Sequence, residues 1–327
     1  MCEGSPTNYS NKLPNMPELT SGLLVVNPLK PEWGPGKVVH VRGGTAFVFF
    51  RDYVEHRKAV KFKVDRLHLA SDQTDPILDN LPPFVEKDGD FLLPSDRITF
   101  DMAVAKFLEV YPGGFYDPMY ESAGKGGERG YKVAACNRYE QLLGNGKGEA
   151  LLAADRVEDL VACTKKIEGP LNLLAVQEKS AFKEGLEDLD AARRFFQALF
   201  PAISAAPNAE FFNRFVDAVA ALPTRGATST DKWTVATLLP FLARPDAFIF
   251  VKPSITKNAA ERLGFDIRYD AHPNWQTYEA VLRMSDIYRD KLASWKPRDF
   301  IDVQSFFWVT GDLYDITVQR RKAAQNK

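Results

Sequence analysis

Two adjacent glycines, Gly43-Gly44, separate two runs of strand-forming residues at 37–42 and 45–50. A two-residue turn that closes a β-hairpin favours glycine, because its central residues need a positive φ. Other strand-like runs stand before and after this pair, so residues 22–70 contain four or five short strands. That many short strands in about 50 residues indicate a small β-barrel.

The last of these runs, residues 58–64, alternates basic and apolar side chains. Such a strand turns one face to a core and one basic face to solvent. Residues 22–69 carry a net charge of +5, whereas the whole chain has −1. A basic face favours a polyanionic partner, because contacts to phosphates release counterions. The residues expected to contact DNA phosphates here are Lys37, Arg42, Lys58, Lys61 and Lys63.

The rest of the chain differs from this module in composition and pattern. Residues 1–21 are polar and proline-rich, which predicts a disordered tail. Residues 71–96 are rich in proline and aspartate and predict a linker. Residues 97–327 carry apolar residues mainly at helical spacing, with a short strand-like run at 247–251. The expected fold class is α+β, a small N-terminal β-barrel followed by a mainly α-helical domain with a few short strands.

Several classes of protein lack support in the sequence. Three cysteines without a CxxC pair and four scattered histidines predict no metal site. No GxGxxG motif follows a strand and no GxSxG motif is visible, so no cofactor is expected. No apolar run approaches the ~18 residues of a membrane span, and the few cysteines are typical of a reducing compartment. We therefore expect a cytoplasmic protein without a membrane partner.

The segment 298–308 combines acids with aromatic residues after a helix-start signal at Lys296-Pro297. If it is helical, Asp299 and Asp302 share a face because they are three residues apart. Burying a carboxylate among aromatic side chains is costly unless it is paired, and sites that need a shifted pKa are built in this way. The alternative is structural: Asp299 caps the helix, Asp302 supports its dipole, and the aromatic residues form core.

A glycine-rich loop at residues 124–127 is flanked by cations and tyrosines. It lacks the spacing of a phosphate-binding P-loop. The cations suit contacts to a nucleic-acid backbone, and the tyrosines suit stacking on unpaired bases. The alternative is a surface loop with solvated charges. The residues concerned are Lys125, Arg129 and Lys132 together with Tyr116, Tyr120 and Tyr131.

One chemistry needs polar residues in aromatic surroundings and no cofactor: hydrolysis of an N-glycosidic bond in DNA. The base is flipped out of the duplex, stacked on aromatic side chains and recognised by hydrogen bonds. A carboxylate then stabilises the positive charge that develops on the sugar and aligns water. Asp302 is the first candidate for this carboxylate and Asp299 the second, while Lys252 would hold a phosphate or form a Schiff base. The candidate substrate-binding residues are Gln304, Ser305, Asn274, Tyr278, Trp308, Glu128 and Tyr131.

A resemblance bears on the N-terminal module. The pattern Asn27-Pro28-x-x-Pro31-Glu32-Trp33-Gly34-x-Gly36-x-Val38, followed by the glycine pair, resembles the SH3/Tudor-like module at the C-terminus of bacterial UvrD/PcrA-type helicases. The resemblance implies an SH3-like barrel that contacts nucleic acid or RNA polymerase, and it implies no catalysis. The alternative is that Trp33 and the glycines only build a turn.

Residues 97–310 resemble an uncharacterised bacterial family with phage-defence associations. The segments that carry the resemblance are Trp233-x-x-x-Thr237-x-x-Pro240-Phe241, Phe250–Ser254, Asn274–Tyr278 and Asp299–Trp308. Its functional analogue is a defence DNA glycosylase that removes glucosylated hydroxymethylcytosine from phage genomes. The leading hypothesis is therefore a base-excising DNA glycosylase that holds double-stranded DNA on its barrel. The alternative is a non-enzymatic adaptor that binds DNA or RNA polymerase, and a nuclease comes third.

Overall fold

The computed structural model describes residues 19–53, 58–75, 78–79, 81, 83–93, 98–124, 126–226 and 228–311. The chain divides into two compact units, residues 1–95 and residues 96–327, which we call unit 1 and unit 2. Among the described residues, all strands belong to unit 1 and all α-helices belong to unit 2. The α+β class expected from the sequence is therefore confirmed.

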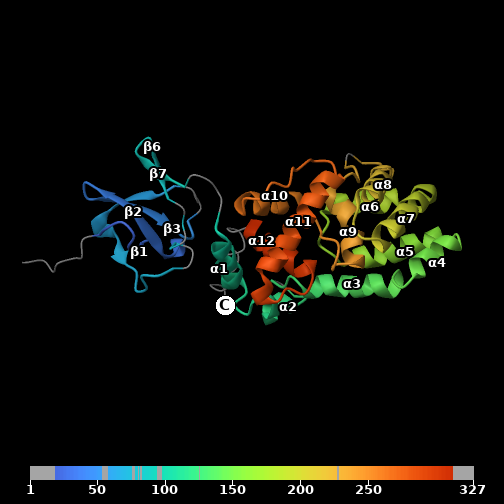
Figure 1. The fold of residues 1–327 in the computed structure, drawn as a ribbon, viewed down its shortest axis with the longest axis horizontal. Helices are drawn as coiled ribbons and strands as arrows, with labels where there is room; N and C mark the ends of the chain where they lie inside the picture. Colours follow the sequence, from blue (N-terminus) through green and yellow to red (C-terminus); the bar gives the residue numbers. More distant parts are fainter. Residues whose placement is uncertain are drawn as a thin grey trace, which may run out of the picture. The chain divides into compact units, whose positions relative to one another are not determined.

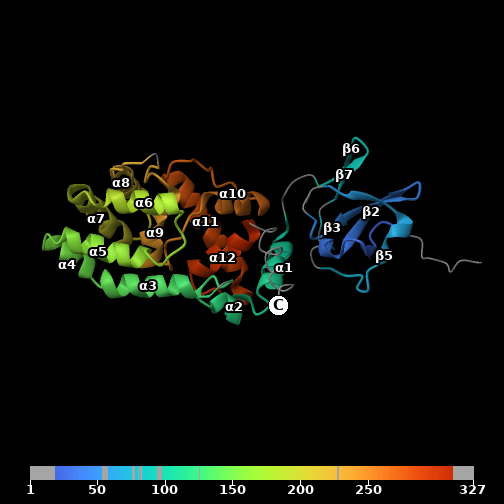
Figure 2. The same cartoon turned by 180° about the vertical axis from the view of Figure 1, so that it is seen from behind.

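The predicted hairpin is present in unit 1, within a curled antiparallel sheet (Figure 1). Gly43 and Gly44 have φ of 56° and 73°, and they connect Arg42 to its cross-strand partner Thr45. The sheet has five strands in the order β4-β3-β2-β1-β5, with β5 at one edge (Figure 2). The bounds are β1 Leu24–Val26, η1 Pro31–Trp33, β2 Gly36–Arg42, β3 Thr45–Phe50, β4 Val60–Lys63, η2 Val64–Arg66 and β5 His68–Leu69.

One face of the sheet packs around Trp33. The centroid of its ring lies 4.3 Å from that of Tyr53 and 5.4 Å from that of Phe50. Gly36 lies so close to the sheet core that a Cβ there would stand 2.6 Å from Val48 Cγ1 and 2.7 Å from Phe50 Cδ1. Packing, rather than an unusual backbone angle, therefore requires glycine at position 36.

The structure differs from the linker predicted over 71–96. Two strands there form a second hairpin, β6 Val85–Lys87 and β7 Asp90–Leu92. Its turn residues, Asp88 and Gly89, both have positive φ, and an Asp-Gly pair is a strong hairpin signal that the surrounding prolines and acids concealed. The ring of Phe91 is buried against Phe47 of the sheet, with centroids 4.9 Å apart. The segment thus completes the hydrophobic core of unit 1.

Unit 2 consists of helices around two hydrophobic clusters. The helices are α1 Phe100–Val110, η3 Gly114–Tyr116, α2 Pro118–Glu121, α3 Gly130–Leu142, α4 Lys147–Ala153, α5 Val157–Glu168, α6 Val176–Gly185, α7 Leu189–Ser204, α8 Ala209–Ala220, α9 Trp233–Ala243, α10 Pro253–Arg262, α11 Trp275–Lys291, η4 Ala293–Trp295 and α12 Phe300–Gly311. Thr99 caps α1, where its side chain accepts a hydrogen bond from Met102 N at 3.1 Å. None of the helices in the described ranges is both long enough and apolar enough to cross a membrane.

The short strands expected in the helical part are a correction to the sequence analysis. Residues 247–251 form no strand, and the described part of unit 2 contains none. The segment is nevertheless buried, and side chains take the place of a neighbouring strand. The Tyr278 hydroxyl bonds both the N–H and the C=O of Ile249, and Thr237 Oγ1 accepts from Val251 N at 3.0 Å. The apolar run reflects burial, and periodicity cannot separate a buried loop from a buried strand.

Helix α12 is enclosed by other elements of unit 2. It packs against α1, α10 and α11 (Figure 1). Of its residues only Trp308 is not buried. The approach to α10 is close, because a Cβ on Gly311 would stand 2.5 Å from the carbonyl oxygen of Ile255. Asp302 and Gln304 of this helix are therefore inside the protein, where each needs a partner.

We expect Gly36→Ala to destabilise unit 1 by about 1–3 kcal/mol, because the new methyl group overlaps buried side chains that cannot move away. Hydrogen exchange of peptides from β2 and β3 in increasing urea measures the effect. The control is Gly43→Asn, which keeps a residue that tolerates positive φ and has open space around it. Equal protection of the two variants would contradict this account of Gly36.

Candidate functional site

Asp302, the first catalytic candidate, is completely buried near the start of α12. Its Oδ1 accepts hydrogen bonds from the Tyr120 hydroxyl at 2.6 Å and from Arg129 Nη1 at 2.9 Å. Its Oδ2 accepts from the backbone N–H of Arg298 at 2.8 Å and from Arg298 Nε at 3.1 Å. These four donors surround the carboxylate, and two of them, Arg129 Nη1 and Arg298 Nε, belong to guanidinium groups whose positive charge neutralises it.

Asp299 has the structural role that the sequence left open for it. Its Oδ1 accepts from Ile301 N at 3.0 Å, so it caps α12. Both of its oxygens also bind Arg129 at 2.7 Å, in a bidentate pair. The exposed fraction of the Arg129 side chain is only 12%, so this cation is committed to the two acids and is not available to DNA phosphate.

Arg298 closes the same cluster from the other side. In addition to its hydrogen bonds to Asp302, Arg298 donates to the Phe115 carbonyl at 2.6 Å and pairs with Glu121 at 2.5 Å. Its guanidinium also lies 4.7 Å from the centroid of the Tyr116 ring. The segment after α1, helix α2 and the start of α12 are thus joined through one side chain.

Lys132 holds the neighbouring predicted residues. Its side chain is 1% exposed, and Nζ donates to Gln304 Oε1 at 2.6 Å, to Glu128 Oε2 at 3.0 Å and to Ser305 Oγ at 3.3 Å. The predicted phosphate contact for Lys132 is wrong, because a buried ammonium cannot reach a bound polyanion. Tyr131 lies beside it, with its hydroxyl 3.4 Å from Glu128.

Two tyrosines of this network and the nearby Cys136 stay protonated, which suits structure rather than catalysis. Burial and the charge of Asp302 raise the pKa of Tyr120 well above its ordinary value. Burial, with the charge of Asp299, raises the pKa of Cys136 to about 12, so its thiol stays protonated. Burial and the charge of Glu128 also raise the pKa of Tyr131 well above its ordinary value, so its hydroxyl stays protonated. A general acid or base titrates near the working pH, and none of these groups does.

The remaining candidates of unit 2 lie apart from this network. Asn274 caps α11, with its Oδ1 accepting from Thr277 N at 2.9 Å. Tyr278 is fully buried and stacks on Phe212 with centroids 4.3 Å apart, so it cannot stack on a base. Lys252 Nζ lies 4.8 Å above the ring of Trp308, and both side chains are part-exposed. Lys125 lies outside the described residues.

In unit 1 three of the predicted basic residues, Arg42, Lys61 and Lys63, lie on one face of the sheet. The register pairs Arg42 with Thr45 and Thr45 with Lys63, and it pairs Phe47 with Lys61. Directly paired residues point to the same side, so these cations share one face, which we call the outer face. Phe47 lies on this face too, and it is buried against Phe91 of the second hairpin. The alternation predicted for β4 is confirmed, because Lys61 and Lys63 are exposed while Val60 is half-buried.

The second hairpin supplies acids to this outer face. Glu86 pairs with Arg42 at 3.1 Å, and Asp90 pairs with Lys58 at 2.8 Å and with Lys61 at 2.9 Å. The two ammonium groups hold the pKa of Asp90 below its ordinary value, so it stays ionised. Residues 70–95 carry a net charge of −5, which offsets the +5 of residues 22–69. Lys37 instead donates to the carbonyl of Leu78 at 2.9 Å.

The contact of Arg298 with Asp302 was not predicted from the sequence, and Tyr120 was expected at the surface although it is buried. Arg298 directly precedes the acid pair, and an arginine beside clustered acids is a usable signal for an ion pair. Tyr120 gave no comparable signal, because its partner is 182 residues away. Within the described ranges, no group of three or more His, Cys, Asp or Glu side chains is placed to hold a metal ion.

We expect Asp302→Asn to destabilise unit 2 by about 3 kcal/mol, because it removes the one fully buried charge of the cluster and leaves Arg129 paired only with Asp299 and Arg298 only with Glu121. Urea unfolding followed by far-ultraviolet circular dichroism measures the change. The matched control is Asp286→Asn, which breaks an exposed pair with Arg289 and should cost at most about 0.5 kcal/mol. An Asp302 variant as stable as this control would contradict a structural role.

Comparisons of the chain with protein-family models, with curated proteins and with solved structures gave no match. The inference of function therefore depends on the contacts within the chain itself.

Proposed function

We propose that the protein is a non-enzymatic adaptor that binds double-stranded DNA through the outer face of unit 1. The observation that carries the proposal is the alignment of Arg42, Lys61 and Lys63 on one face, in adjacent rows of the sheet. The resemblance to an SH3-like module implies the same kind of partner for these residues. An ordered row of cations suits a phosphate backbone, which is recognised by charge rather than by sequence.

The acids of the second hairpin do not close this face to DNA. The side chains of Arg42 and Glu86 are 57% and 44% exposed, and those of Lys58 and Lys61 are 45% and 51% exposed. Exposed ion pairs contribute little to stability, so each cation can exchange a carboxylate for a phosphate at low cost. Lys63 is exposed, and no ion pair engages it within the described residues. Glu86 and Asp90 instead lower the affinity for DNA, which suits an adaptor that binds DNA reversibly.

A base-excising glycosylase is less well supported than an adaptor. Its carboxylate has to face the sugar of a bound nucleotide, whereas both oxygens of Asp302 are occupied by buried donors. Asp299 is engaged by Arg129 and by the end of α12. Lys252 lies against Trp308, apart from both acids. The aromatic candidates for base stacking are in part committed to the core.

Replacing Lys61 and Lys63 together by glutamine should weaken binding to duplex DNA and leave specificity unchanged. We expect the slope of log affinity against log salt to fall in magnitude by about 1 for each lysine that contacts a phosphate. Fluorescence anisotropy with a labelled duplex at several salt concentrations measures it. Lys30→Gln is the matched control, because Lys30 is exposed in unit 1 but lies outside the strand rows.

Two outcomes would contradict the adaptor hypothesis. One is a salt slope that is the same for the parent and for the double variant. The other is release of a base, with abasic sites, when the parent protein is incubated with DNA that contains modified cytosine.

A second candidate partner is a protein, such as the RNA polymerase that the resemblance implies. Leu29 favours it, because its side chain is 75% exposed at a turn held by Asn27 Oδ1, which accepts from Leu29 N at 3.0 Å. An exposed leucine side chain can bury apolar surface against a partner protein. Leu29→Asp should abolish co-purification with RNA polymerase and leave DNA binding intact. Co-purification that survives this change would remove the candidate.

A further inference from the structure

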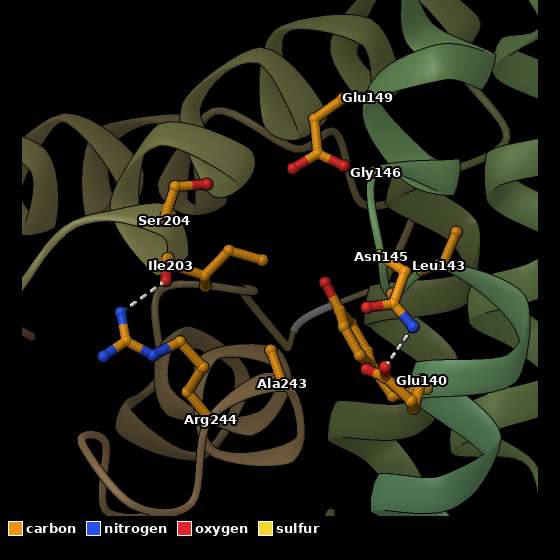
Figure 3. Close-up of a pocket in the computed structure, with 11 residues that line it drawn as sticks. Glu140, Leu143, Asn145, Gly146, Glu149, Ile203, Ser204, Ala243 and Arg244 are labelled. Atoms are coloured by element: carbon orange, nitrogen blue, oxygen red, sulfur yellow. Dashed lines mark hydrogen bonds between the residues drawn. The ribbon is translucent and has the colours of Figure 1, made fainter.

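A pocket of about 450 Å³ lies at the far end of α3 from the Asp302 network. Figure 3 shows its two walls, with Glu140, Asn145 and Glu149 on one side and Ser204 and Arg244 on the other. The residues that line it are Tyr139, Glu140, Leu143, Gly144, Asn145, Gly146, Glu149, Ile203, Ser204, Ala243 and Arg244. Its volume is in the range of pockets that hold small organic molecules.

The backbone makes this pocket electronegative. Helices α3, α7 and α9 end at Leu142, Ser204 and Ala243, so three helix C-termini meet at its wall. The C-terminal end of a helix carries partial negative charge and favours a cation. One helix, α4, contributes its N-terminus at Lys147, and the three C-termini outweigh it.

Two glutamates add formal negative charge. Glu140 accepts only from the amide of Asn145, at 2.5 Å, and no hydrogen bond or ion pair engages Glu149 among the described residues. The nearby Lys147 is turned to the carbonyl of Gln141 at 2.8 Å. Arg244, on the opposite wall, donates to the carbonyls of two residues at the end of α7. Neither cation therefore neutralises the glutamates.

Tyr139 is the second, independent sign of a ligand. Its side chain is 3% exposed and lines the pocket, yet its hydroxyl has no hydrogen-bond partner in the described structure. Burial, together with the charges of Glu149 and Glu140, raises its pKa, so the hydroxyl stays protonated. Buried hydroxyls are nearly always bonded, and a neutral phenol oxygen can accept from a ligand N–H.

We propose that this pocket binds a small organic amine of the polyamine class. Its ammonium group would lie between Glu140 and Glu149 and donate to the oxygen of Tyr139. Its methylene chain would lie against the apolar side chains of Leu143, Ile203 and Ala243. An organic cation fits better than a metal ion, because apolar groups form much of the wall and only two acids face it.

Isothermal titration calorimetry of the full chain with spermidine and with putrescine tests the proposal. We expect one site per chain, and Glu140→Gln and Glu149→Gln should each weaken binding by about tenfold or more, because each removes a charge-assisted hydrogen bond. Glu158→Gln is the matched control, since Glu158 is an exposed acid in the first turn of another helix. Neutral 1,4-butanediol and Mg²⁺ should not bind at this site.

Tyr139→Phe separates a ligand contact from a structural role. The variant should bind spermidine more weakly, and its unfolding temperature without ligand should be unchanged or higher, because an unpaired buried hydroxyl is removed. Three results would each overturn the proposal: no binding of either amine, binding that survives both glutamate changes, or equal binding of butanediol.

Discussion

A carboxylate without contact to solvent needs hydrogen-bond donors and a positive charge beside it. In unit 2 this holds for Asp302, which is completely buried. Tyr120 reaches it from α2, Arg129 from the segment before α3, and Arg298 from the segment before α12. Residues that are far apart in sequence are therefore held in one arrangement by a single charge. Removing one partner of such a cluster is costly, because the other charges stay buried without compensation.

Helix α3 runs from the Asp302 network at its start to the pocket at its end. The helical rise between Arg129 and Tyr139 is about 15 Å. Both places contain tyrosine, arginine and acid side chains. At its start, tyrosine, arginine and acid side chains satisfy one another completely. At its end, the Tyr139 hydroxyl and the Glu149 carboxylate have no partner in the described structure. Ligands bind where polar groups are unsatisfied, so the second site is the better place to look for small-molecule recognition.

Much of the local structure was predictable, because its causes lie within a few residues. The glycine pair at 43–44 needs positive φ, and Thr99 caps the helix that follows it. The failures had non-local causes. Residues 247–251 look like a strand, but within the described ranges no strand pairs with them. The segment 71–96 looks like a linker, yet Phe91 is buried in a core formed by earlier residues. Composition cannot show where a distant surface will meet a segment.

The sequence by itself determined the α+β class, the hairpin and several helix caps, since these follow from backbone preferences and side chains close in the chain. It also singled out Asp299 and Asp302 as a pair of acids and, separately, Arg129 and Lys132 as cations beside a glycine-rich loop. Only the tertiary structure decided that Arg129 neutralises both acids while Lys132 pairs with Glu128, and that Glu86 and Asp90 offset the basic face of unit 1. The reason is physical: the availability of a charge depends on which opposite charge lies within a few ångströms, and folding sets that distance.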